Sequence, residues 1–163
     1  MEEIKFEKVS MYDSLESLRE ENKTTKELVL AIGNFIVKHA RSLPEEYEAK
    51  SILESRLTPP EEAFEKGLLS CGAIANMSAS MLRHLGFEVK LIYGESEDSV
   101  DHAWISVLDP ESNEWLQYDL TRGDGVVLPT NIMKGETDSW ESVKDKILED
   151  HTTYRERMEE RGL

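Results

Sequence analysis

The sequence is poor in cysteine, in positive charge and in long apolar runs. Its 163 residues include one cysteine, Cys71, which excludes an internal disulfide framework and any metal site built from several cysteines. The 34 acidic residues outnumber 19 basic ones, for a formal net charge of -15. This balance argues against nucleic acid or an anionic membrane surface as a partner. No stretch approaches the roughly 18 consecutive apolar residues of a membrane-spanning helix.

The N-terminal segment carries no targeting signal that we can identify. The first ten residues, MEEIKFEKVS, contain no basic stretch followed by an apolar run, so they predict no signal peptide and favour a cytoplasmic protein. A length of 163 residues is typical of one domain, and a hydrophobic content of 39% is enough for a packed core. We therefore expect residues 1–163 to form a single acidic domain.

Apolar periodicity predicts helices in the first half of the chain and again at its end. Apolar residues three and four positions apart indicate helices, and capping-box and proline signals mark several of their starts. The predicted helices lie at residues 11–22, 26–40, 44–57, 59–66 and 71–85. A final helix is expected after Asp138, which heads a capping box before an apolar stripe from Trp140 to Met158.

Alternating apolar and polar residues predict strands in the second half. The pattern places them at residues 87–93, 102–108 and 114–120, with a further short strand at residues 126–128. The turn-forming residues 109–113 indicate that the second and third strands pair as an antiparallel hairpin. Helices followed by an antiparallel sheet and a last helix define an α+β fold.

Cys71 lies at the predicted start of a helix. The unpaired N–H groups and the dipole of a helix N-terminus favour a thiolate, so this position suits a reactive cysteine. The alternative is a structural cysteine, because free cysteines are among the most buried residues and are usually inert. The position alone leaves both interpretations open, and the neighbours of the thiol must decide between them.

The predicted hairpin supplies a base and a carboxylate for such a thiol. If its turn is centred near Ser112, His102 falls opposite roughly residue 120, and Asp119 lies beside or diagonal to it. A carboxylate that binds one ring nitrogen of a histidine leaves the other nitrogen to accept a thiol proton. We therefore predict Cys71 as the nucleophile, His102 as the base and Asp119 as the residue that orients the base.

Residues 58–121, the motif-bearing core, resemble the transglutaminase-like superfamily. In that family a Cys-Gly pair opens a helix that ends in Leu-Arg-x-Leu-Gly, and a His-Ala-Trp strand and a Trp-x-x-x-Asp strand follow. The matching residues are Cys71, Gly72, Leu82, Arg83, Leu85, Gly86, Gly94, His102, Ala103, Trp104, Trp115, Asp119 and Thr121. The resemblance implies a papain-like fold in which the cysteine-bearing helix packs on an antiparallel sheet, with a Cys71–His102–Asp119 catalytic triad.

The resemblance also implies a function. We expect a cysteine hydrolase or acyltransferase that attacks a peptide or carboxamide bond and forms an acyl-enzyme. Water as the acceptor would make it a peptidase or amidase, and an amine would make it a cross-linking enzyme. Such an enzyme needs a peptide or protein substrate and no metal or organic cofactor. The alternative is a non-catalytic protein-binding module that keeps the same fold.

Three further features bear on this hypothesis. Trp104 and Trp115 lie on the hairpin and are candidates for the wall of a substrate groove, although strand aromatics more often serve packing. Leu120 follows Asp119 where the family often has a proline. The oxyanion hole needs a second donor beside the Cys71 N–H, and Gln117, the only glutamine, lies on the wrong segment for that role. The upstream candidates, among which the sequence does not decide, are Asn34, Tyr12 and Tyr47.

Overall fold

The structure is a computed structural model that describes residues 10–43, 52–97, 101–146, 156 and 159–160. Within these residues helices come first and a sheet follows, as the α+β prediction requires. The helices are α1 (Leu15–Glu21), α2 (Thr25–Ser42), α3 (Ile52–Leu57), α4 (Pro60–Lys66) and α5 (Cys71–His84). The strands are β1 (Val89–Glu95), β2 (His102–Asp109), β3 (Glu114–Tyr118) and β4 (Ile132–Thr137), before the 3-10 helix η1 (Trp140–Val143).

The four strands form one antiparallel sheet in the order β3-β2-β1-β4. The hairpin of β2 and β3 pairs Ile105 with Tyr118 and Asp109 with Glu114. Continued along both strands, this register sets His102 opposite residue 121, within one residue of the expected position. Strand β3 ends at Tyr118, so Asp119 follows it directly rather than lying within it.

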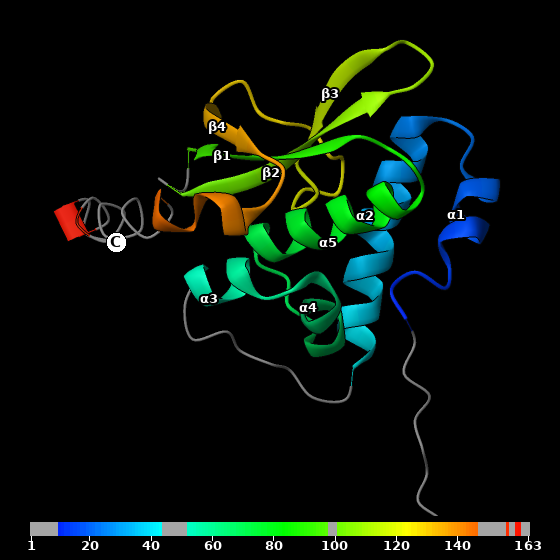
Figure 1. The fold of residues 1–163 in the computed structure, drawn as a ribbon, viewed down its shortest axis with the longest axis horizontal. Helices are drawn as coiled ribbons and strands as arrows, with labels where there is room; N and C mark the ends of the chain where they lie inside the picture. The colour runs from blue at the N-terminus through cyan, green and yellow to red at the C-terminus, as the bar shows by residue number, and fades with distance from the viewer. Residues whose placement is uncertain (1–9, 44–51, 98–100, 147–155, 157–158, 161–163) are drawn as a thin grey trace, which may run out of the picture.

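Helix α5 lies between the sheet on one side and α3 and α4 on the other, with α2 crossing nearby (Figure 1). Its sequence explains this central position. The Ser70 side chain caps the N-terminus by accepting a hydrogen bond from the Ala73 N–H at 3.2 Å, as Ser commonly does at this position. Small buried residues such as Ala75 and Ala79 let neighbouring elements approach closely. The fold therefore fixes the Cys71 end of α5 against the sheet.

Two predicted elements differ in the structure. Residues 126–128 form no strand; the fourth strand is β4, which alternation did not reveal because its residues are mostly exposed at the sheet edge. The final helix is capped by Ser139, whose side chain accepts from the Glu141 N–H, and not by Asp138. Most of the predicted final helix, and the first turns of the predicted helix 44–57, lie outside the described residues. No helix among the described residues is both long enough and apolar enough to cross a membrane.

Candidate active site

Cys71 is the first residue of α5, as the sequence predicts, and its side chain is half-buried. Ser70, its N-cap, fixes the first turn, so the thiol sits at the positive pole of a 14-residue helix. On the far side of the thiol the first residues of β2 approach, because α5 packs across the sheet face to which β2 contributes Ala103 and Ile105. This placement brings the thiol to the start of the strand that carries His102.

His102 and Asp119 form a buried hydrogen-bonded pair. His102 Nε2 lies 2.7 Å from Asp119 Oδ2, with side chains that are 15% and 4% exposed. Asp119 is itself held, because Oδ1 accepts from the N–H of Thr121 at 3.1 Å and from its hydroxyl at 2.5 Å. Since the carboxylate occupies Nε2, the other ring nitrogen of His102 is left for Cys71. The hairpin thus joins imidazole and carboxylate as its sequence predicts.

The electrostatics of Cys71 and His102 are shifted in opposite directions. Burial alone would raise the pKa of Cys71, but the hydrogen bond with His102, the charges of Arg56 and His102, and a backbone hydrogen bond with Ala103 outweigh it and lower the pKa. Burial alone would lower the pKa of His102, but its hydrogen bonds with Asp119 and Cys71 outweigh burial and raise that pKa to about 10. A thiolate beside an imidazolium is the protonation state that these shifts favour at neutral pH.

Asp119 remains charged in spite of its burial. Burial raises the pKa of this carboxyl, but the hydrogen bonds from His102 and Thr121 and the charge of His102 lower it further, so the net pKa is below its ordinary value. An ionised Asp119 can hold His102 in one orientation and stabilise its positive charge.

The two tryptophans of the hairpin lie in different places. Trp104 is buried, donates through Nε1 to Gln117 Oε1 at 3.0 Å, and has its ring 5.7 Å from that of His102. With Cys71 and Asp119 it lines a narrow hollow that leaves almost no room for a water molecule. Trp115 pairs with Leu108 near the turn of the hairpin, is 44% exposed and lies under Lys90. The structure therefore brings Trp104, and not Trp115, to the thiol.

Two of the three upstream candidates for an oxyanion donor, Tyr12 and Asn34, lie away from Cys71. The hydroxyl of Tyr12 bonds Ser80 Oγ at 2.8 Å, and its ring stacks on His84 near the other end of α5. Asn34 lines a separate hollow between α2 and the segment after β3, and Tyr47 lies outside the described residues. The described part of the chain contains no group of three His, Cys, Asp or Glu side chains suited to hold a metal ion.

One residue near the site was not predicted. Arg56 at the end of α3 is buried and acts on Cys71 through its charge. The sequence around Arg56 gave no indication of this role, because Arg56 lies in a weakly periodic helix 15 positions before the cysteine. Its proximity arises from the packing of α3 against α5, which short-range patterns do not reveal.

Comparison with known proteins places this geometry in a family. Residues 14–120, more than half of the chain, match the model of the transglutaminase-like superfamily. The chain belongs to that superfamily, and the resemblance read from the Cys-Gly, His-Ala-Trp and Trp-x-x-x-Asp motifs is confirmed.

Two kinds of relative accompany this match. The chain is 34% identical over 64 residues to peptide-N(4)-(N-acetyl-beta-glucosaminyl)asparagine amidases of Rattus norvegicus, Mus musculus and Macaca fascicularis. That stretch covers 39% of this chain but 9% of each amidase. A crystal structure from Cytophaga hutchinsonii, provisionally named a cysteine protease, superimposes with a TM-score of 0.58 at 15% identity, over 80% of this chain and 44% of that one. This structural likeness confirms the papain-like fold.

Proposed function

We propose that this chain is a cysteine hydrolase that cleaves a peptide or carboxamide bond through Cys71, His102 and Asp119. The observation that carries the proposal is the buried His102–Asp119 hydrogen bond at 2.7 Å beside the helix-starting Cys71. The opposite pKa shifts of the thiol and the imidazole support it, because they favour a nucleophile and an acid that are ready together.

The proposed reaction needs no group beyond these side chains and water. The Cys71 thiolate attacks the carbonyl carbon and forms a C–S bond, while the helix N-terminus stabilises the negative charge that develops on oxygen. His102 then donates its proton to the leaving amine, the C–N bond breaks and a thioester remains. His102, now neutral, takes a proton from water as the oxygen of that water attacks the thioester. The acid leaves, and the thiolate–imidazolium pair is restored.

Hydrolysis is proposed over transfer to an amine because the matched relatives carry the name of amidases. The match covers a small part of those proteins, so their substrate is not transferred to this chain. The shared chemistry is attack on a carboxamide carbon, and the acyl-enzyme is common to both outcomes. The experiment must therefore identify whether water or an amine takes the acyl group from Cys71.

The experiment is to incubate the chain with a panel of fluorogenic peptide and side-chain amides, to quench it in acid and to weigh it by mass spectrometry. We expect release of the amine and an acyl adduct on Cys71, with Cys71→Ala as the inactive control. Added lysine should leave the product acid unchanged. An amide-linked lysine product would contradict hydrolysis and favour transfer. Equal peptide binding by the wild type and Cys71→Ala, with no adduct on either, would identify a binding module instead.

A further inference from the structure

The start of β2 is tied to α3 by a buried ion pair. Arg56, 2% exposed, places Nη2 2.8 Å from Oδ1 of Asp101, whose side chain is 11% exposed. Asp101 directly precedes His102 in the chain. The pair therefore links a helix on one side of the thiol to the residue that leads into the imidazole on the other side.

The side chain of Arg56 also fits against the first turn of α5. A Cβ atom built on Gly72 would lie 3.0 Å from Arg56 Nε and 3.1 Å from its Cβ and Cγ, so a larger residue would force Arg56 to shift by a few tenths of an ångström. The guanidinium lies 5.2 Å from the centroid of the Trp140 ring, and Trp140 Nε1 donates to the Gly72 carbonyl at 3.4 Å. Arg56 is thus enclosed by α5, η1 and the start of β2.

A second contact joins α3 to the same turn. The hydroxyl of Ser55, next to Arg56, hydrogen-bonds the hydroxyl of Ser70, which caps α5. Two neighbouring residues of α3 therefore contact the two residues that flank Cys71, Ser70 by its side chain and Gly72 by its backbone.

Among the described residues, two charged side chains act directly on the thiol. From α3 the group is Arg56, and from the start of β2 it is His102; Asp101 and Asp119 act on those two cations, one each. After burial and the His102 hydrogen bond, the charge of Arg56 is the next effect on the pKa of Cys71, and it lowers that pKa. Unlike a histidine, an arginine is always charged in proteins.

We propose that Arg56 is a positioning residue for the Cys71–His102 pair: it fixes the start of β2 through Asp101 and holds a permanent positive charge against the helix turn that carries the thiolate. This inference rests on the proposed function, in which the thiolate is the nucleophile. It goes further by adding a fourth side chain, outside the three family motifs, to the machinery that prepares the thiol.

The test is the pH titration of the thiolate in the folded protein, followed by its ultraviolet absorbance with Cys71→Ala as the blank. Arg56→Met keeps most of the side-chain volume and removes the charge. We expect it to raise the pKa of Cys71 by about one unit, which is the scale of a nearby opposite charge. Arg56→Lys, which restores the charge, should recover most of the shift.

A matched control is Arg83→Met. Arg83 lies on the same helix, about 18 Å from Cys71 at 1.5 Å per residue, and donates to the Val89 carbonyl at 2.8 Å. Arg83→Met makes the same change in net charge as Arg56→Met. We expect the pKa of Cys71 to stay within about 0.2 units of the wild type, because charges beyond a Debye length are screened. Equal shifts in Arg83→Met and Arg56→Met would overturn the proposal.

The double variant Arg56→Met/Asp101→Asn separates the effect of the Arg56 charge on the pKa of Cys71 from its effect on stability. It removes both ions of the pair, so that neither is left unpaired. We expect its urea midpoint to lie closer to the wild type than that of Arg56→Met, while the pKa of Cys71 stays raised. A double variant with the wild-type pKa would show that Arg56 serves packing alone and would overturn the inference.

The wild-type titration distinguishes the two proposals. A low pKa of Cys71 that Arg56→Met leaves unchanged overturns the role of Arg56 and leaves the proposed function standing. A wild-type thiol that titrates at an ordinary value overturns both.

Discussion

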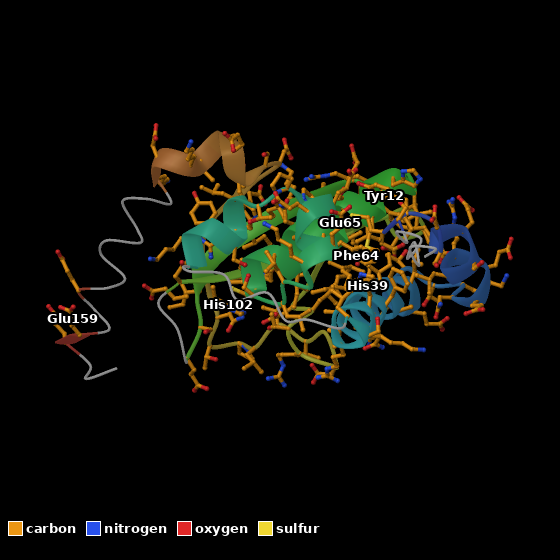
Figure 2. The ribbon with its side chains drawn as sticks, turned by 90° about the horizontal axis from the view of Figure 1, so that it is seen from below. Tyr12, His39, Phe64, Glu65, His102 and Glu159 are labelled. Carbon is orange, nitrogen blue, oxygen red and sulfur yellow. The ribbon has the colours of Figure 1, made fainter. Side chains whose placement is uncertain are left out.

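A histidine and an arginine lie near each end of α5, in different surroundings. At the first end Cys71 meets His102, and Arg56 is buried beside it. At the last end His84 and Arg83 are both exposed, and His84 stacks on Tyr12 with ring centroids 4.6 Å apart. Figure 2 labels Tyr12 at the upper right of the molecule and His102 below its middle, so the two side chains are separated in this view.

The difference between these ends lies in burial and in fixed partners. His102 has a carboxylate at 2.7 Å and a half-buried thiol, and its pKa is raised to about 10. His84 has an aromatic ring as its partner and stays in contact with solvent. A histidine and an arginine near a helix are therefore no sign of chemistry by themselves. What shifts the pKa of such a side chain is burial against groups of complementary charge.

The largest effect is expected when the histidine at each end of α5 is removed. His102→Ala should lower the rate of Cys71 acylation by about 10²- to 10⁴-fold, the scale of general acid–base catalysis. His84→Ala should stay within about twofold, because no proton in the proposed reaction passes through it. Steady-state kinetics with the best amide of the panel measure both. Comparable losses in the two variants would remove the distinction between the ends.

A second comparison uses the glycine near each end. Gly72→Ala crowds Arg56, and Gly86→Ala meets no atom within 4 Å but has a backbone φ of +95°. We expect each to cost roughly 1–3 kcal/mol of unfolding free energy in urea, from overpacking in the first case and backbone strain in the second.

The readout that separates the two glycines is the thiol. Gly72→Ala should also raise the pKa of Cys71, because it displaces the Arg56 charge, and Gly86→Ala should leave the alkylation profile unchanged. An unchanged profile in Gly72→Ala at reduced stability would mean that the fit of Arg56 serves packing alone.

The pH dependence of stability provides a third test. In the proposed thiolate–imidazolium pair, folded Cys71 and His102 together hold one proton, which is on the imidazole. Between the ordinary pKa values of 6.5 and 9.0 the unfolded chain also holds one proton, on the thiol. The pair therefore adds no slope to wild-type stability in this range. In Cys71→Ala, the stability from His102 is complete below pH 6.5 and is lost as the pH rises through the folded pKa.

We accordingly expect the unfolding free energy of Cys71→Ala to fall by roughly 1–2 kcal/mol between about pH 6.5 and 8.5, relative to the wild type. Urea unfolding at a series of pH values measures this. The variant Cys71→Ala/His102→Ala is the control and should follow the wild-type slope. Parallel curves for the wild type and Cys71→Ala would contradict the shared proton.

The smallest effect is expected from Tyr12→Phe. It removes the hydrogen bond to Ser80 at 2.8 Å and keeps the stacking on His84. We expect a loss of about 1 kcal/mol in urea unfolding and no change in thiol reactivity. A reduced acylation rate at unchanged stability would return Tyr12 to the candidates for the oxyanion hole.

The hairpin shows how far the sequence alone reaches. The pairing of His102 with Asp119 depends on two strands and one turn, so local patterns place the two side chains within reach of each other. The register agrees with the expected one to within one residue, and it could not be predicted more exactly because composition does not specify turn length. Strand β4 was missed for a related reason: an exposed edge strand has no buried face to impose alternation.

The residues that were missed or misplaced depend on packing between distant segments. Arg56 reaches the thiol only because α3 docks on α5, and its partner Asp101 lies 45 positions along the chain. Trp115 and Trp104 share a hairpin and a residue type, and only the register shows that one lies near the turn and the other beside His102. Motif spacing thus predicts the nucleophile and its partners, and tertiary contacts decide which further side chains act on them.

The most direct test of the central claim is the alkylation of native Cys71 by iodoacetamide between about pH 5 and pH 8, in the wild type and in His102→Ala. The account predicts fast labelling of the wild type already at about pH 6 and a clear decrease in the variant, because the imidazolium stabilises the thiolate. A thiol that reacts only after denaturation, or one whose rate is the same with and without His102, would contradict it.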